Sequence, residues 1–283
     1  MHKCLRDLYL VTEASMSNEP ISLSKVQSVT PQEMQVPTDI VPLPSQGRVY
    51  PPGSPLAGKS GIDIKSMTAK DEDILTSRAL VRSGRVISSL LRSCIIDKTI
   101  DPDKMLVGDR NSALIGIRIT GYGPGYPIKI ECPECGAEVK KEVDLTSLPI
   151  KTFPEDLAIE AGKNAFTFTM PVSKKVATFK LLTGEEEYEL LQTIERGRKT
   201  NSGEELVTGR LKMQVIELSG EKDPQKLAST IRNLPARDSR ELRRYIDKIT
   251  PGIELTTDFS CELCSFKGEV EVPLGTDFFW PST

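Results

Sequence analysis

Two cysteine pairs with the same spacing constrain this chain more than any other feature of its 283 residues. One pair lies in "ECPECGAEVKK" and the other in "SCELCSFKG", with two residues between the cysteines of each pair. Alternating stretches flank each pair, so each is expected at the turn of a β-hairpin. Two such turns facing each other would place four thiolates around one tetrahedral ion, as in a zinc ribbon. We therefore predict a structural Zn²⁺ held by Cys132, Cys135, Cys261 and Cys264.

The ligand set also indicates what the ion would do. Four sulfur ligands leave no open position for water, which is typical of a structural site and not of a catalytic one. Closing a loop of about 125 residues between the pairs costs on the order of 4 kcal/mol. Structural zinc contributes roughly 10 to 16 kcal/mol in small peptides, so it could hold the two segments together.

Residues beside the cysteines are consistent with a metal site. Gly136 readily adopts the left-handed conformation that turns backbone amides towards the sulfurs. Lys140, Lys141 and Lys267 lie close enough in sequence to offset the negative charge of four thiolates. Two alternatives stay open. One is a redox-active CxxC, which usually begins a helix in a thioredoxin-like unit, and the other is a set of cysteines that binds no ligand.

The histidine content and the net charge exclude several function classes. The only histidine is His2, beside the first methionine, where the chain is expected to be mobile. Ser-His-Asp triads, Cys-His dyads and HExxH zinc hydrolases need a rigidly held histidine, so none can be built and we do not expect an enzyme. A net charge of -3 and a pI near 5.5 do not indicate nucleic-acid binding. No apolar run approaches the roughly 20 residues that span a bilayer, so no membrane partner is expected. The chain is expected to be made in a reducing cytoplasm. In that compartment, paired cysteines favour metal binding over disulfide bonds.

One stretch matches a nucleotide-binding motif in its letters only. Residues 53–60, "GSPLAGKS", satisfy the GxxxxGK[ST] pattern of a phosphate-binding loop. That loop needs a buried strand before it and a helix after it, so that helix amides face the phosphate. Here the prolines of "RVYPP" do not suit a central strand, and "GIDIKSM" alternates like a strand. Nucleotide binding is therefore not expected.

The chain is expected to have an α+β fold in which two hairpins form a zinc ribbon. The Pro- and Ser-rich start predicts an extended or disordered arm, and apolar periodicity predicts helices before and between the hairpins. The predicted divisions are the arm (1–60), a helical segment (61–125), the zinc-ribbon hairpins (126–145 and 253–274), a mostly helical insertion (146–252) and an aromatic C-terminal tail (275–283).

Local signals place several helices within this plan. "TAKDEDILTSRALV" is predicted to be a helix with Thr68 as its N-cap. Cys94 falls on the apolar face of the next helix, which indicates a core residue. In "DRNSALIGIRITGYGPGY", "IGIRIT" alternates like a strand, but the whole also fits a helix that ends at Gly121, and the helix is favoured. Leu211, Val215 and Leu218 of "LKMQVIEL" are expected on one face of a further helix.

Two more helices are expected near the end of the insertion. Asp223 is predicted to cap a helix that begins with Pro224, and Asp238 and Glu241 have the spacing of a capping box. The arginines of the last helix alternate with acidic residues. Its outer face is therefore interpreted as a solvated surface.

The tail contains the aromatic sequence "DFFWP". Clusters of this kind often anchor protein interfaces, which makes Phe278, Phe279 and Trp280 a candidate partner anchor. The alternative is that the tail folds back and fills the protein's own core. A truncation after Leu274 would separate the two, because only loss of core packing would unfold the chain.

An ordered set of motifs resembles a known family. The chain contains "VPLPSQGRVYPPGSPL", "MTAKDEDILTSRALV", "MLVGDRNSALIGIRITGYG", "CPECG" and "GTDFFWP" in this order. Together they resemble the baseplate hub and hub-assembly protein family of T4-like contractile-tailed bacteriophages, from about residue 41 to the C-terminus. The resemblance implies contacts with other phage baseplate hub and tail proteins, in the host cell cytoplasm during assembly or in the virion tail baseplate. It supplies no catalytic residues.

A rival from another class is a zinc-ribbon nucleic-acid-binding factor. The acidic pI and the lack of an aromatic and basic surface on either hairpin disfavour this alternative.

Overall fold

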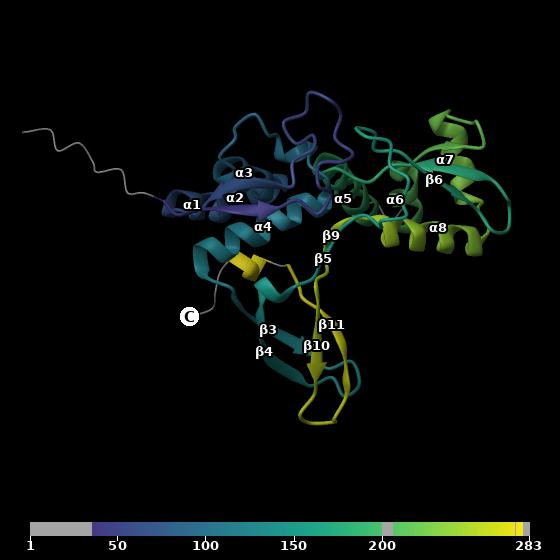
Figure 1. Cartoon of the computed structure of the whole chain (residues 1–283). Coiled ribbons are helices and arrows are strands. Elements are labelled where there is room, and N and C mark those ends of the chain that lie inside the picture. Colours follow the sequence, from purple (N-terminus) through teal and green to yellow (C-terminus); the bar gives the residue numbers. More distant parts are fainter. Residues whose placement is uncertain (1–35, 200–205, 275, 280–283) are drawn as a thin grey trace, which may run out of the picture. The chain divides into compact units, whose positions relative to one another are not determined.

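Helices and small antiparallel sheets alternate along the chain, which confirms the α+β class (Figure 1). The computed structural model describes residues 36–199, 206–274 and 276–279. The first part begins with two paired strands and continues through four α-helices and a short 3-10 helix. These elements are β1 (Thr38–Pro42), β2 (Gly61–Lys65), α1 (Ala69–Thr76), α2 (Arg78–Ser83), α3 (Val86–Cys94), η1 (Pro102–Lys104) and α4 (Val107–Tyr122).

The two CxxC stretches lie at the turns of antiparallel β-hairpins. The first hairpin and the 3-10 helix after it are β3 (Gly125–Glu131), β4 (Glu138–Asp144) and η2 (Leu145–Ser147). A short ladder of β5 with β9 closes the base of the insertion between the hairpins. This ladder, the second hairpin and the last 3-10 helix are β5 (Ile150–Lys151), β9 (Gly252–Ile253), β10 (Thr256–Ser260), β11 (Lys267–Glu271) and η3 (Thr276–Phe279).

The insertion contains an antiparallel sheet, in the order β6-β7-β8, as well as helices. Its elements are β6 (Phe166–Thr169), β7 (Val176–Phe179), α5 (Gly184–Lys199), α6 (Leu206–Gln214), β8 (Val215–Leu218), α7 (Pro224–Arg232) and α8 (Ala236–Ile249). The single helix predicted for "LKMQVIEL" is wrong, because α6 ends at Gln214 and a strand follows. Val215 and Leu218 are nevertheless both buried, since a bulge in the β7–β8 ladder shifts the register between them.

Residues 36–60 are folded, which contradicts the predicted arm over this part of 1–60. β1 pairs with β2, and the turns that follow bury Leu43, Val49 and Leu56 within the main hydrophobic core. Composition indicated disorder because apolar residues are few in this segment. The few apolar residues that are present pack into the main hydrophobic core. Residues 1–35 of the predicted arm lie outside the described residues.

A buried carboxylate on α4 holds this segment in place. Asp109 accepts hydrogen bonds from the amide and hydroxyl of Ser45, at 2.9 and 2.5 Å, and from the hydroxyl of Tyr50 at 2.7 Å. The Tyr50 oxygen accepts the Leu106 amide at 2.8 Å. Burial raises the pKa of Asp109, although these hydrogen bonds act in the opposite direction. Through this network, a helix far along the chain holds the turn-rich segment in its folded conformation.

Several local predictions are confirmed. Thr68 is the N-cap of α1 and forms a capping box with Asp71. Asp223 caps α7, which begins with Pro224. Cys94 is fully buried in the core. In each case the signal and its effect lie within a few residues of each other.

The helix predicted over "TAKDEDILTSRALV" is divided into two. α1 ends at Thr76, and Ser77 has an extended backbone conformation. The Ser77 hydroxyl accepts the amide of Leu80 and so becomes the N-cap of α2. A serine that can cap a new helix explains the break.

Asp238 does not cap α8, contrary to the prediction. The helix begins two residues earlier, at Ala236, so Asp238 lies in its first turn and is fully buried. Its carboxylate accepts the amides of Val172 at 2.7 Å and Ser173 at 2.9 Å, in the turn between β6 and β7. The residue therefore joins α8 to the sheet.

The stretch 53–60 lacks the geometry of a phosphate-binding loop. It forms turns, and within the described range 36–199 the strand β2 follows it instead of a helix. Lys59, which would contact the phosphates of a nucleotide, forms an ion pair with Asp97 at 3.2 Å. The strand that follows residues 53–60 thus agrees with the sequence-based reason for rejecting a phosphate-binding loop, which needs a helix at this position.

Substitution of the buried carboxylate should weaken the fold. Asp109→Ala would leave the donors of Ser45 and Tyr50 buried without an acceptor, and each unsatisfied group costs about 1 to 3 kcal/mol. We expect the free energy of unfolding to fall by about 2 to 4 kcal/mol in urea titrations. The control is Asp63→Ala, at an exposed position of β2, which should change it by less than about 0.5 kcal/mol. Equal effects of the two substitutions would contradict the role of the network.

Candidate metal centre

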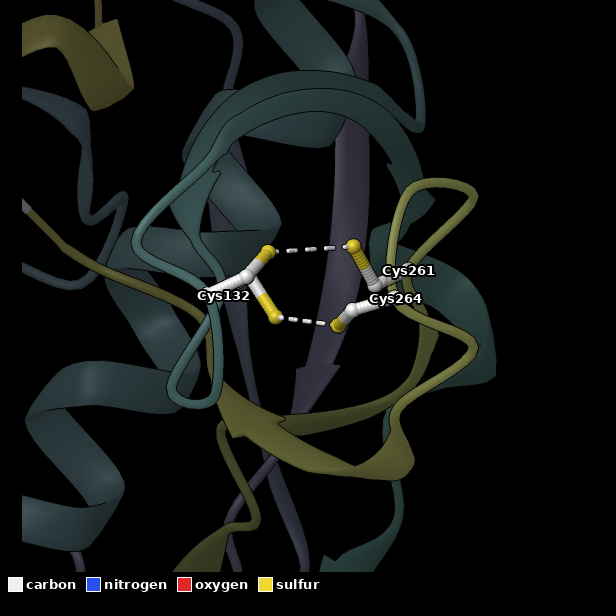
Figure 2. Close-up of side chains that lie close together, drawn as sticks. Cys132, Cys261 and Cys264 are labelled. Atoms are coloured by element: carbon white, nitrogen blue, oxygen red, sulfur yellow. Dashed lines mark hydrogen bonds between the residues drawn. The ribbon is translucent and has the colours of Figure 1, made fainter.

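Four cysteine thiols meet between the turns of the two hairpins (Figure 2). The sulfur atoms of Cys132, Cys135, Cys261 and Cys264 all lie within 4.8 Å of one another. The Cys132 sulfur is 3.6 Å from that of Cys264, and the Cys135 sulfur is 3.8 Å from that of Cys261. The structure therefore brings together the four residues that the spacing singled out as ligands.

The sulfur separations fit a tetrahedral metal site. With metal–sulfur bonds of about 2.3 Å, tetrahedral geometry places the sulfurs about 3.8 Å apart. The separations of 3.6 and 3.8 Å across the hairpins agree with this value. A disulfide would need about 2.05 Å, and all four cysteines are free thiols. The cluster could therefore hold a metal ion through four sulfur ligands.

The two CxxC turns share one backbone pattern. In the first, the Cys132 amide donates to the Ala137 carbonyl, and the Gly136 amide donates to the Cys132 carbonyl. Cys261 and Ser265 make the equivalent bonds in the second turn. The residue after each second cysteine has a positive φ, 70° at Gly136 and 61° at Ser265. The sequence indicated this conformation only where the residue is glycine.

Backbone amides favour the thiolate form of one cysteine. Hydrogen bonds from the amides of Cys264 and Leu263 lower the pKa of Cys261 to about 7, although burial acts in the opposite direction. A thiol with this pKa is about half ionised at neutral pH, and the thiolate is the form that binds metals. Cys132 and Cys261 are buried, whereas Cys135 and Cys264 are exposed, so one side of the cluster faces solvent.

Three lysines line a hollow between the hairpins. They are the residues expected to offset the thiolate charge, Lys140, Lys141 and Lys267. Lys141 donates to the Thr257 hydroxyl at 3.0 Å and to the Asp258 carbonyl. These bonds run from β4 to β10, so Lys141 also connects the two hairpins directly.

The aromatic tail packs inside the protein, which favours the alternative to a partner anchor. Phe278 is 1% exposed and Phe279 is 5% exposed. The Phe278 ring meets the Tyr126 ring edge-on, with 5.1 Å between centroids. These two residues are therefore not surface anchors in this structure. Trp280, the third residue of the candidate anchor, lies outside the described residues.

A buried arginine holds the tail against the first hairpin. Arg118 of α4 donates from Nε to the carbonyl of Phe278 at 2.8 Å, and from Nη1 and Nη2 to the carbonyls of Gly123 and Gly125 at 3.0 and 3.1 Å. The guanidinium also lies over the Tyr122 ring, 5.1 Å from its centroid. No sequence pattern singled out Arg118. The available signal was one charged residue inside the apolar run "LIGIRITGY".

Removal of the tail ring should destabilise the protein. Phe278→Ala deletes a fully buried side chain, which typically costs about 3 to 5 kcal/mol. Chemical unfolding of the purified protein measures this loss. Leu263→Ala is the control, because Leu263 is 77% exposed at the second CxxC turn and should matter by less than about 0.5 kcal/mol. If Phe278→Ala behaves like the control, the tail does not contribute to the core.

The cluster should hold one metal ion per chain. Native mass spectrometry of protein purified without chelator is expected to show that single ion. Cys264→Ser removes one of four ligands and should abolish or greatly weaken retention of the ion. Cys94→Ala, in the core of α3, should leave it unchanged. A folded wild-type protein without metal would exclude the site.

The chain matches a family of bacteriophage proteins. Among the described residues, no helix is long and apolar enough to cross a membrane. No curated protein and no solved structure gave a match. The family model described as "T4 bacteriophage base plate protein" matches residues 42–280, a range that includes both hairpins, the insertion and η3. Because this range is most of the sequence, the chain belongs to the T4 bacteriophage base plate protein family.

Proposed function

We propose that the protein is a component of the tail baseplate hub of a T4-like bacteriophage, or a factor that assembles this hub. The observation that carries the proposal is the family match over residues 42–280. The ordered motifs that resemble hub and hub-assembly proteins support a role at the hub of the baseplate. The role is structural and not enzymatic. The protein acts through contacts with other hub and tail proteins in the host cytoplasm during assembly, and in the finished tail if it is a component.

The proposed ion is Zn²⁺. Four thiolates in a tetrahedral arrangement suit zinc, and iron is the main competitor for the same ligand set. Zinc has no redox chemistry, and four sulfur ligands leave no position for a reactive water. The ion would therefore contribute stability alone, which agrees with a protein that works through its surfaces.

Zinc would join segments that the insertion separates. Cys132 and Cys135 lie between β3 and β4, and Cys261 and Cys264 lie between β10 and β11. Direct contact between the hairpins includes the bonds of Lys141. The ion would fix the relative position of the two turns, and with it the surface that the hairpins present to other hub proteins.

Mass spectrometry of purified tails tests the hub role. If the protein is a component, its peptides should occur at a constant ratio to those of other baseplate proteins. If it is an assembly factor, its peptides should be absent from tails, and tails should fail to form when its gene is deleted. Tails that lack the protein and form in normal number without its gene would refute both versions.

Elemental analysis of the purified chain tests the metal independently. One zinc per chain in a colourless protein is the expected result. Iron bound to four thiolates would absorb visible light, so a coloured protein containing iron would overturn the zinc assignment while leaving the hub role intact.

A further inference from the structure

Helix α2 buries none of its six residues. Its sequence "RALVRS" nevertheless includes the apolar residues Ala79, Leu80 and Val81. Leu80 is half-buried, whereas Val81 is 59% exposed. Most helical stability in proteins comes from packing of an apolar face, and a helix this short is not stable alone in water. Core packing therefore does not explain why α2 is formed or why its centre is apolar.

Caps at both ends build α2 without a buried face. Ser77 accepts the amide of Leu80 at the start of the helix. At the end, Gly84 has a φ of 66°, and its amide reaches the carbonyls of Leu80 and Val81. The Arg85 amide adds a bond to the Leu80 carbonyl. The helix is thus formed before any partner arrives, so binding costs little ordering entropy.

Two arginines on α2 make no ion pair with the part of the chain that the structure describes. Arg78 and Arg82 are four residues apart and lie on one face of the helix, with Val81 beside them. Among the residues that the structure describes, neither arginine has a carboxylate within ion-pair distance. The nearby Asp71 and Glu72 of α1 accept hydrogen bonds from other side chains. The face of α2 is therefore positively charged around an apolar centre.

The basic face of α8 is arranged differently. Arg240 and Arg244 share the carboxylate of Glu241, at 3.1 and 3.5 Å, and Asp247 reaches Arg210 at 3.7 Å. The apolar side of α8 is buried in the core. Its charges are balanced along its own surface, which agrees with the interpretation of a solvated face. Helix α2 has no buried residue, and its two arginines have no ion-paired acid among the described residues.

We propose that α2 is a docking surface for another tail protein that presents an apolar pocket edged by carboxylates. Val81 would enter the pocket, and Arg78 and Arg82 would pair with the carboxylates. The charge of the face selects an acidic partner, and arginine is among the residues that contribute most to protein interfaces. This inference rests on the proposed baseplate function and specifies where one of its contacts is made.

Charge reversal in phage that lack the gene tests the surface. Complementation with the Arg78→Glu/Arg82→Glu protein is expected to lower the yield of complete tails about tenfold or more, because arginines at an interface often carry much of its affinity. The matched control is Lys104→Glu/Lys248→Glu, two exposed positions outside α2, which should stay within about twofold of wild type. Both purified variants should unfold at the wild-type temperature, since the changed side chains are exposed.

A photoreactive amino acid in place of Val81 identifies the partner and does not depend on the charge reversal. Cross-links to an acidic segment of another tail protein are expected. The docking surface is overturned if no cross-links form, or if they form only within the chain or only to further copies of it. It is also overturned if the Arg78→Glu/Arg82→Glu protein gives the wild-type yield of tails. The proposed function fails separately, if purified tails lack the protein and tails also form normally without its gene.

Discussion

Two charged side chains buried along α4 connect segments that are far apart in sequence. Asp109, in the first turn, binds Ser45 and Tyr50, and Arg118 binds the carbonyls of Gly125 and Phe278. A buried charge that lacks its partners costs several kcal/mol. Each group is therefore tolerated only when its complete set of partners is in place. The N-terminal turns, the first hairpin and the tail consequently depend on the same helix, and they are expected to fold with it as one cooperative unit.

Close approach of the backbone adds to this dependence. A side chain at Gly116 would collide with Val41 of β1, and one at Gly108 would collide with the carbonyl of Pro251. Strand β1 and the chain that leaves the insertion therefore pack directly against α4. Because the β5–β9 ladder lies next to Pro251 in sequence, the base of the insertion is fixed to the same helix. The insertion is thus attached to the rest of the protein without help from the cysteines.

Several sequence predictions failed where the deciding partner lies far away in sequence. Thr68, Asp223 and the paired cysteines were interpretable because a cap or a metal site is recognised from spacing. Residues 36–60 were misjudged because their packing depends on Asp109, 64 positions after Ser45. Asp238 was misjudged for the same reason, since its carboxylate binds amides 65 and 66 positions away. Composition and periodicity contain no information about such partners. The identity of the metal is also not contained in the sequence, because the spacing of the four cysteines indicated only that a metal site exists.

The hairpins show why a metal site suits this part of the chain. A two-stranded hairpin is marginally stable by itself in water, and β4 and β11 have mostly exposed or half-buried side chains. The buried residues beneath the hairpins, such as Tyr126 and Phe259, are too few to form a core of their own. Arg118 and Phe278 fix the base of the first hairpin, but no comparable contact reaches the turns within the described residues. An ion bound to the four cysteines would supply the missing constraint at the end of the hairpins farthest from α4. Its loss should therefore loosen the turns first and leave the helical part folded.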